Sequence, residues 1–284
     1  MLEIRNLNYR IGKKSIIEDF SYQFKPGIYG LLGSNGSGKT TLMRCITGIY
    51  ELKTDAILYE GLIIRNNKKF SEVISYLPQR FGLFKDLTVK EMMLMMASLK
   101  GVNIKNNPKI VEDSIGIVNL SDKLNDKVRT LSGGMIRRLG IAQTLLNDPK
   151  IIIFDEPTVG LDIEERLRFK NIVSDISKDR IIIISTHIAS DIEALCDEVV
   201  VMKDKGILFT GSCAEVAKQA RAKTYVLLQD ELFNIEHEYH IQNHFEKDGK
   251  HFVRIVTNIS LSMANVEIVD PTIEDGYICL LKGI

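Results

Sequence analysis

Three uninterrupted apolar runs, at residues 28–32, 151–154 and 181–184, constrain the fold of this chain more strongly than any other sequence feature. A strand with one face in water alternates apolar and polar residues. Runs without alternation instead indicate strands of a parallel sheet that is covered on both faces. Apolar residues at helical spacing lie between the last two runs, at residues 169–176. This alternation predicts an α/β core with ligand sites beyond the carboxyl ends of its strands.

The two ends of the chain have a different pattern. Residues 2–7 are strand-like, and Phe20, Tyr22 and Phe24 alternate with polar residues, which predicts an antiparallel unit before the core. From about Lys223 onward the pattern favours a small α+β appendage. Its expected elements are strands at residues 225–228, 251–256 and 266–269 and a helix that opens at Pro271-Thr272.

Composition and charge exclude several classes of protein. Hydrophobic residues make up 45% of the chain, which is too apolar for a disordered protein. Lys plus Arg and Asp plus Glu both number 37, so no net positive charge attracts nucleic acid, and we expect no such partner. The four cysteines are far apart, which favours reduced thiols in the cytoplasm. No apolar stretch approaches the roughly 20 residues of a membrane span, and residues 1–5 lack a signal-peptide core, so we expect neither insertion nor export.

A glycine-rich motif follows the first apolar run directly and precedes a helical segment that ends near Gly48. It reads Gly33-Ser34-Asn35-Gly36-Ser37-Gly38-Lys39-Thr40 and matches the phosphate-loop pattern G-x-x-x-x-G-K-[ST]. The glycines let successive N–H groups point into one concavity, and the helix start adds positive potential, so the loop can bind a β-phosphate. In this pattern Lys39 reaches the β- and γ-phosphates and the Thr40 hydroxyl binds Mg²⁺. An ordinary glycine-rich turn is the alternative, and the position between strand and helix argues against it.

Two adjacent carboxylates, Asp155 and Glu156, end the second apolar run. Neighbouring positions of a strand face opposite sides, so we expect the two acids to have separate roles. We predict that Asp155 is the partner of Mg²⁺ and that Glu156 orients and polarises the water that attacks the γ-phosphate. Apolar strands that end in two acids are common, and only the phosphate loop upstream makes this interpretation specific.

Further motifs resemble those of one family. The segment Leu131-Ser132-Gly133-Gly134-Met135 lies between the loop and the carboxylates, and with it the sequence strongly resembles the ATPase subunits of ATP-binding cassette (ABC) transporters. Gln79, the segment 159–162 and His187 match the Q-loop, the D-loop and the switch histidine of that family, in the same order. Ser132 is a good helix N-cap, and we expect the buried face of the following helix to begin at Ile136 and Leu139.

The resemblance implies a head-to-tail dimer in which each ATP lies between the phosphate loop of one subunit and the signature of the other. Glu156, Gln79 and His187 would be catalytic: Glu156 and Gln79 manage the attacking water and Mg²⁺, and His187 contacts the γ-phosphate. Asp162 would communicate across the interface. The residues expected at Mg²⁺ are Thr40, Gln79 and Asp155. The residues expected to bind ATP are Gly33, Ser34, Asn35, Gly36, Ser37, Gly38, Lys39, Thr40, Thr41, Ser132, Gly133, Gly134 and Asp162.

The resemblance also implies a fold and partners. The fold would be a P-loop NTPase core with an antiparallel β subdomain and a helical signature subdomain, plus the small C-terminal α+β appendage. The ATP-binding domain would span residues 1–215, with the helical insertion at about 80–148, and the appendage residues 220–284. The partners would be a second, identical ATPase subunit and a membrane permease on another chain, contacted around residues 79–84. The chain would then lie in the cytoplasm on the inner face of the cell membrane.

Several details refine the resemblance. Met135 and the segments 139–143 and 271–275 resemble the subgroup of ATPases that serve separate export-type permeases. The family's adenine-stacking aromatic residue, however, corresponds to Ile11 here. Tyr9 lies two residues earlier on the same expected strand face, so it either replaces that aromatic or packs against the sheet.

Two other clusters have ordinary explanations. The methionine-rich segment 91–97 is interpreted as core packing of the helical insertion rather than as an adaptable binding surface. Histidines of the C-terminal region suggest a metal site. On a regular strand, however, His240 and His244 share a polar face opposite Ile241 and Phe245, which favours solvated side chains.

Three functions compete. We favour the energising subunit of a membrane exporter. A non-transport ABC ATPase acting on DNA or the ribosome would need two cassettes or a long coiled-coil insertion, whereas only about ninety residues separate Thr40 from Leu131. A regulatory protein that binds ATP without turnover is disfavoured by the intact Asp155, Glu156 and His187.

Overall fold

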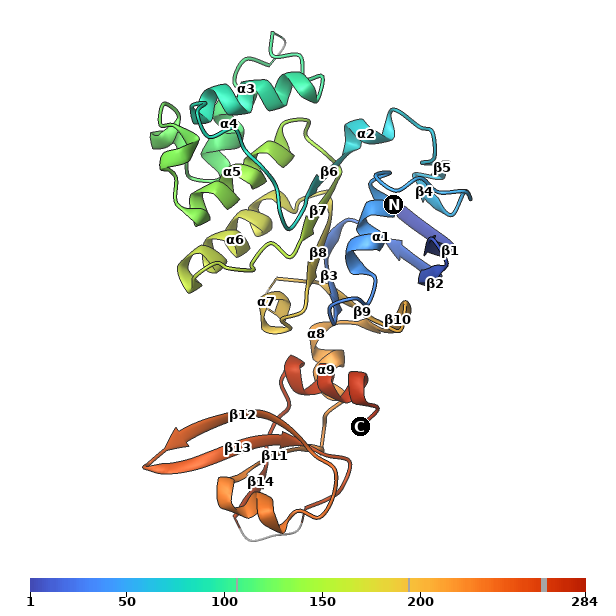
Figure 1. Cartoon of the computed structure of the whole chain (residues 1–284), viewed down its shortest axis with the longest axis vertical. Coiled ribbons are helices and arrows are strands. Elements are labelled where there is room, and N and C mark those ends of the chain that lie inside the picture. Colours follow the sequence, from blue (N-terminus) through green and yellow to red (C-terminus); the bar gives the residue numbers. More distant parts are fainter. Residues whose placement is uncertain (106, 194, 262–264) are drawn as a thin grey trace.

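The computed structural model describes residues 1–105, 107–193, 195–261 and 265–284. These residues form a central, mostly parallel sheet and two antiparallel sheets. Figure 1 shows the central sheet in the larger part of the molecule, with the helical insertion on one side and the first antiparallel sheet on the other.

The central sheet contains the three apolar runs side by side. Its strands, in order across the sheet, are β10 (Gly206–Gly211), β9 (Glu198–Lys203), β3 (Gly27–Gly33), β8 (Ile181–Thr186), β7 (Ile151–Asp155) and β6 (Ile74–Leu77). Five of them are parallel, and β10 runs antiparallel to β9 at the edge. Every residue of β7 and β8 is buried, because helices or the other sheet cover both faces. The predicted α/β core is therefore confirmed.

The first antiparallel sheet packs against one side of the core. Its strands are β2 (Lys14–Phe24), β1 (Leu2–Ile11), β4 (Ile57–Tyr59) and β5 (Leu62–Ile63). Phe20 and Phe24 are buried in a cluster that also includes Leu42 and Met43 of α1 (Lys39–Ile46) and Ile153 of β7. Helix α1 is thus held between the two sheets, and its first residue lies at the carboxyl edge of the central sheet.

Helices cover the other face of the central sheet. They are α3 (Val89–Leu99), α4 (Ile110–Ile117), α5 (Gly133–Leu145) and α6 (Ile163–Ile176), and the short α2 (Phe70–Val73) and α7 (Ser190–Glu193) lie at the margins. Met92 and Met93 are buried among apolar side chains of this layer, which confirms the core interpretation of the methionines. On α5, Leu139 is buried as predicted, but Ile136 is only partly buried, and Arg137 and Arg138 are buried instead. None of the described helices is long and apolar enough to cross a membrane.

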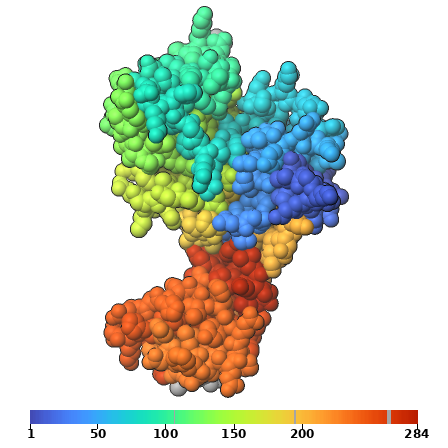
Figure 2. Space-filling model, viewed as in Figure 1, coloured from blue at the N-terminus to red at the C-terminus, as the bar shows by residue number. Residues whose placement is uncertain are grey.

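The C-terminal residues form the second antiparallel sheet. Its strands are β12 (His240–Lys247), β13 (Lys250–Val256), β11 (Thr224–Leu228) and β14 (Val266–Ile268). One face packs a small core of Tyr225, Leu227, Val253 and Ile255. Figure 2 shows this part as a separate lobe that joins the rest of the molecule through a narrower region.

The histidine prediction for this sheet is wrong in one respect. His240 pairs with Val256 and His244 pairs with Val253, with a register shift between Ile241 and Asn243. Paired residues share a face, and positions 253 and 256 of a regular strand face opposite sides, so the two histidines lie on opposite faces. The cause is a β-bulge, which inserts one residue and reverses the alternation. The structure groups no three His, Cys, Asp or Glu side chains as a metal site in the part of the chain that it describes.

Helix α9 (Ile273–Lys282) connects the C-terminal sheet to the core. Its residues Ile273 and Tyr277 are buried with Leu32 and Val201 of the central sheet. A Cβ at Gly276 would collide with the backbone of α8 (Cys213–Lys218), so the two helices cross in direct contact. The sequence assigns this helix to the appendage, whereas in the structure its apolar side packs on the core.

Candidate functional site

The phosphate loop connects β3 to α1 at the carboxyl edge of the central sheet. Gly36 and Gly38 have φ angles of 86° and 106°, which L-residues avoid. A Cβ on Gly33 would lie 2.6 Å from Ser37 Oγ and 2.7 Å from the carbonyl oxygen of Met202, so this position has no room for a side chain. The Ser37 hydroxyl is buried without a hydrogen-bond partner among the described residues. An unpartnered hydroxyl in a glycine-rich loop at a helix start fits a bound phosphate.

The Lys39 side chain is 6% exposed and folds back along the loop. Its Nζ donates to the carbonyl oxygens of Gly33 at 2.6 Å and Ser34 at 3.2 Å, and it lies 3.9 Å from Glu156 Oε1. Burial lowers the pKa of Lys39, and the negative charges of Glu156 and Asp155 oppose that shift. The buried ammonium group is therefore placed to bind an anion in the loop.

The Asp155 carboxylate is held by three hydroxyl groups. Thr40 Oγ1 and Ser185 Oγ donate to its Oδ1 at 3.3 and 2.7 Å, and Tyr76 donates to its Oδ2 at 3.1 Å. Burial and the nearby Asp155 charge raise the pKa of Tyr76, so its hydroxyl stays a proton donor at neutral pH. Adjacent carboxylate and hydroxyl oxygens are the ligands that Mg²⁺ prefers, and the pair of Thr40 and Asp155 fits that cation.

Glu156 lies one residue beyond β7 and has a left-handed backbone with a φ of 47°. Its N–H donates to Ser185 Oγ at 2.9 Å, and its Oε2 lies 2.8 Å from Nδ1 of His187. Because the strand ends at Asp155, the alternation of strand faces does not extend to Glu156. Both carboxylates therefore reach the same site, one toward Thr40 and the other toward Lys39 and His187.

The signature and D-loop residues lie apart from this group, whereas the backbone of Gln79 is joined to that of Glu156 through Arg137. Gln79 is exposed just beyond β6, and Ser132 and Asp162 are exposed N-caps that accept backbone N–H bonds at the starts of α5 and α6. Gly133 is open to solvent. Figure 1 shows α5 and α1 on opposite sides of the central sheet. Among the described residues, no hydrogen bond or ion pair joins the signature to the phosphate loop of its own chain.

The other loop residues share the loop's exposed rim. Ser34, Asn35 and Gly36 are exposed, and Thr40 and Thr41 of the first turn of α1 are half-buried. A cavity of about 770 Å³ adjoins this rim. Its walls are the loop, the start of β2, the turn between β9 and β10, and the last residues of α9.

Tyr9 lies away from that cavity. Its ring stacks on Tyr50, with centroids 5.3 Å apart and planes at 3°, in the cluster that covers α1. The pairing of β1 with β2 shifts between Tyr9 and Arg10, so the assumed regular alternation to Ile11 is interrupted. Ile11 is 51% exposed. The geometry favours sheet packing for Tyr9.

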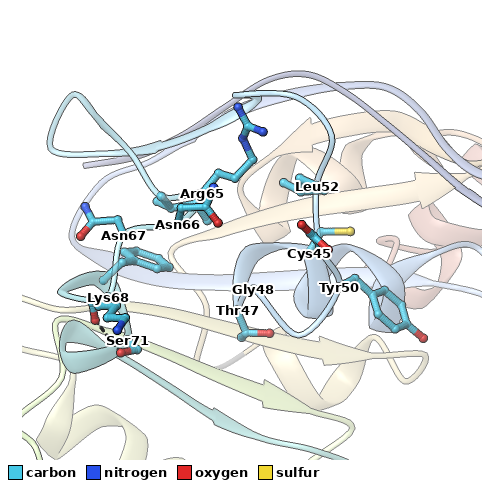
Figure 3. Close-up of a pocket in the computed structure, with 13 residues that line it drawn as sticks. Cys45, Thr47, Gly48, Tyr50, Leu52, Arg65, Asn66, Asn67, Lys68 and Ser71 are labelled. Atoms are coloured by element: carbon cyan, nitrogen blue, oxygen red, sulfur yellow. Dashed lines mark hydrogen bonds between the residues drawn. The ribbon is translucent and has the colours of Figure 1, made fainter.

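A second cavity, of about 670 Å³, lies at the other end of α1. Figure 3 shows its lining residues, which come from the end of that helix and from the segment that includes Arg65, Asn67 and Ser71. Neither the phosphate loop nor the two carboxylates line it. It is therefore separate from the site.

Three residues of the site have no counterpart in the sequence prediction: Ser185, Tyr76 and Arg137. Ser185 pairs with Asp155 in the register of β7 and β8, so a polar residue at the end of a buried run is the signal that identifies it. Tyr76 lies on β6 and pairs with Ile153 of β7, so its hydroxyl reaches Asp155 from a register position that gives no such signal. Arg137 donates to backbone carbonyls around both carboxylates. Burial lowers the pKa of Arg137 to about 10, but this value is still above neutral pH, so the guanidinium group stays protonated.

A parallel sheet that delivers a glycine loop, a buried lysine and two carboxylates to one edge defines a phosphate-loop nucleotide-binding protein. Residues 17–159 match the family described as ABC transporter. The chain belongs to the ABC transporter family, as one of its ATP-binding cassettes.

Relatives of known name support this assignment. The chain is 34% identical over 208 residues to the uncharacterised ABC transporter ATP-binding protein YhcH of Bacillus subtilis, covering 72% of this chain and 67% of that protein. It is 33% identical over 206 residues to Nod factor export ATP-binding protein I of Burkholderia orbicola, and the match covers 72% of this chain and 68% of that protein. ABC transporter A family member 8 of Dictyostelium discoideum is 35% identical over 190 residues, which are 66% of this chain but 23% of that protein. The chain therefore spans less than a quarter of that longer relative.

Solved structures agree on the fold. An ATP-binding subunit of an ABC transporter superposes with a TM-score of 0.68 at 24% identity, over 77% of this chain and 92% of that chain. The cbiO1 protein of Clostridium perfringens, part of the ABC transporter complex cbiONQ, superposes with a TM-score of 0.68 at 27% identity, over 76% of this chain and 89% of that chain. The predicted P-loop NTPase fold is confirmed.

Proposed function

We propose that this chain hydrolyses ATP as the energising subunit of an ABC exporter whose permease is a separate chain. The observation that carries the proposal is the convergence of Lys39, Asp155, Glu156 and His187 at the phosphate loop. A protein that only bound ATP would need the loop and the lysine, but not a second carboxylate paired with a histidine.

Each residue has a distinct task in this proposal. The loop N–H groups and Lys39 bind the β- and γ-phosphates and bring the reacting phosphate next to Glu156. Glu156 accepts a hydrogen bond from the attacking water and orients it, and Gln79 contributes to the same water and to Mg²⁺. Thr40 and Asp155, with Gln79, would hold Mg²⁺, which would neutralise phosphate charge. His187, whose side chain is 40% exposed, contacts the γ-phosphate.

A second copy of the chain completes the site. The exposed Ser132 and Gly133 at the start of α5 form a helix amino-terminal end that can face the phosphates bound by another subunit, and Asp162 at the start of α6 lies at the same interface. A head-to-tail homodimer would then have two equal sites. Residues 1–215 form the ATP-binding domain and residues 220–284 a C-terminal domain, whose last helix, α9, packs on the central sheet and bonds the C-terminal sheet through Asp275 and Arg254.

The export direction and the membrane partner rest on relatives. The Burkholderia orbicola relative is named for Nod factor export, and the Clostridium perfringens neighbour is described as part of a transporter complex. We propose that this chain likewise sits at the cytoplasmic face of the cell membrane through a permease. Copurification with a permease in detergent tests this, and a chain recovered without any membrane protein contradicts it.

Glu156→Gln separates binding from hydrolysis. The amide keeps the shape of the side chain but cannot act as a base for water, so ATP and Mg²⁺ should produce a stable dimer while phosphate release falls roughly 100-fold or more. Size-exclusion chromatography and a phosphate-release assay measure the two effects.

Glu112→Gln is the matched control, because Glu112 is an exposed carboxylate on α4 that pairs with Lys90. We expect its phosphate release to equal that of the unaltered chain. Undiminished hydrolysis in Glu156→Gln contradicts the catalytic assignment, and a variant that stays monomeric with ATP and Mg²⁺ contradicts the dimer.

A further inference from the structure

Arg137 is a buried arginine two residues beyond the signature on α5, and it is 8% exposed. Its five hydrogen bonds to described residues all go to backbone carbonyl oxygens. A guanidinium group has five N–H donors in a rigid plane, so every donor has an acceptor. This arginine therefore acts on the backbone of its neighbours rather than on a charged partner.

The acceptors belong to two catalytic segments. Nε donates to Pro157 at 2.9 Å, and Nη2 donates to Asp155 at 3.2 Å and Glu156 at 3.0 Å. Nη1 donates to Gln79 at 3.1 Å and Pro78 at 3.4 Å. One side chain thus joins the segment of the two carboxylates to the segment of Gln79.

Both segments lie at the ends of strands, where the sheet leaves some carbonyl groups without a strand partner. β7 ends at Asp155 and β6 at Leu77, and buried carbonyl groups beyond a strand end need other partners. Glu156 in addition has a φ of 47°, a conformation that a residue with a side chain keeps only when its surroundings hold it. Ser185 binds its N–H group and Arg137 binds its carbonyl group, so the two together fix the direction of the Glu156 side chain.

A second contact attaches the Gln79 segment to α5. The Arg137 guanidinium lies 5.6 Å from the centroid of the Phe81 ring. The same ring packs on Gly140, where a Cβ would approach Phe81 Cζ to 2.5 Å. The absence of a side chain at Gly140 is what allows this approach.

We propose that Arg137 is a positioning residue that makes the placement of Glu156 and Gln79 depend on the position of the signature helix. The inference rests on the proposed function, because α5 also carries the signature that faces the second ATP of the dimer. ATP bound between this signature and the phosphate loop of the second subunit fixes α5. Through Arg137, the fixed α5 then holds the backbone of Glu156 in the site at this chain's own phosphate loop. The arginine thereby couples occupancy of one site to hydrolysis in the other.

Arg137→Lys tests the role. Lysine keeps the charge but has three N–H donors on one nitrogen and cannot span five carbonyls. We expect kcat for ATP hydrolysis to fall roughly 10- to 100-fold while the Kd for ATP changes less than about threefold. Unchanged kcat overturns the proposal.

A double variant separates positioning from general stability. Because the Glu156 carboxylate is already lost, adding Arg137→Lys to Glu156→Gln should lower the residual rate by a clearly smaller factor than Arg137→Lys does in the unaltered chain, and the remaining loss acts through Gln79. If Arg137→Lys lowers the hydrolysis rate of Glu156→Gln by the same factor as it lowers the rate of the unaltered chain, the proposal is overturned.

Arg138→Lys is the matched control. Arg138 is the next residue and is equally buried, but it donates to Val118 and Asn119 and pairs with Glu165, away from both carboxylates. We expect a similar loss of thermal stability and a kcat within about threefold of the unaltered chain. An equal loss of kcat in both variants overturns the proposal.

Gly140→Ala keeps the test decisive if Arg137→Lys does not fold. Its methyl group displaces Phe81, and with it the Gln79 segment, and leaves every Arg137 donor present. We expect a lower kcat with the Kd for ATP retained, and unchanged kcat here overturns the proposal. Should Glu156→Gln itself keep hydrolysing ATP, the catalytic assignment of Glu156 in the proposed function fails. Should it lose hydrolysis while Arg137→Lys and Gly140→Ala do not, only this inference fails.

Discussion

The two ends of the proposed nucleotide site are built differently. At the phosphate end, the Lys39 side chain is 6% exposed and Asp155 is 2% exposed, and each is held by several hydrogen bonds. At the base end, Ile11 is 51% exposed, and the cavity beside the rim of the loop has the charged side chains of Lys205 and Lys282 among its walls. Buried, fixed donors bind an anion more strongly than mobile exposed ones, because they lose little entropy and act in a lower dielectric. The contrast predicts that affinity for ATP comes from the phosphates and that the base contributes little.

Lys39→Ala should have the largest effect. The change removes the only lysine ammonium that donates hydrogen bonds to the phosphate loop among the described residues, and we expect the Kd for ATP to rise roughly 100-fold or more. Isothermal titration with a non-hydrolysable ATP analogue measures it.

Lys205→Ala is the control from the base end, where Lys205 pairs on the surface with Glu18. We expect the Kd for ATP to change less than about threefold, because exposed charges are screened by solvent. An equal loss of affinity for ATP in the two variants would contradict the idea that the phosphate end contributes most of the affinity.

Ser185→Ala should have an intermediate effect, on catalysis rather than on binding. The Ser185 hydroxyl accepts the N–H of Glu156 and donates to Asp155, so its loss removes one hydrogen bond from each of the two catalytic segments. Thr40 and Tyr76 still donate to Asp155, which is why the expected effect is intermediate. We expect kcat to fall roughly tenfold with KM nearly unchanged.

Steady-state kinetics of Ser185→Ala beside Ser177→Ala checks this, because Ser177 is the C-cap of α6, far along the chain from both carboxylates, and its hydroxyl donates to the carbonyl oxygen of Ser174. A rise in KM without a change in kcat would show that the hydroxyl serves binding instead.

Ile11→Tyr should have the smallest effect, a gain in affinity. An aromatic ring at this position can stack on the base, which on the scale known for nucleic-acid bases contributes roughly 1 kcal/mol or more, or about a fivefold lower Kd for ATP. The unaltered chain should discriminate poorly between ATP and GTP. Comparative titrations of both nucleotides with both proteins provide the measurement.

Tyr9→Ala distinguishes the rival account. Because Tyr9 stacks on Tyr50, we expect its removal to lower thermal stability and to change the Kd for ATP less than about twofold. A large loss of affinity in Tyr9→Ala, with no gain in Ile11→Tyr, would assign the base-stacking role to Tyr9 instead.

The local patterns of the sequence determined the central sheet and the phosphate loop. Continuous apolar runs imply burial on both faces, and a glycine loop before a helix implies an anion site, because both depend on residues close together in the chain. The positions of Asp155 and Glu156 at a strand end follow from the same kind of pattern. The signature, Q-loop, D-loop and switch motifs came from the family resemblance, since each is too short to identify a function by itself.

Only the tertiary structure decided which side chains meet. Ser185 reaches Asp155 because β7 and β8 pair in one particular register, and Arg137 reaches five carbonyl oxygens because α5 packs over the ends of two strands. The bulge between Ile241 and Asn243, which reverses the strand face, leaves no trace in a period-two pattern. Contacts between residues far apart in the chain are set by register and packing, and a local pattern contains no information about either.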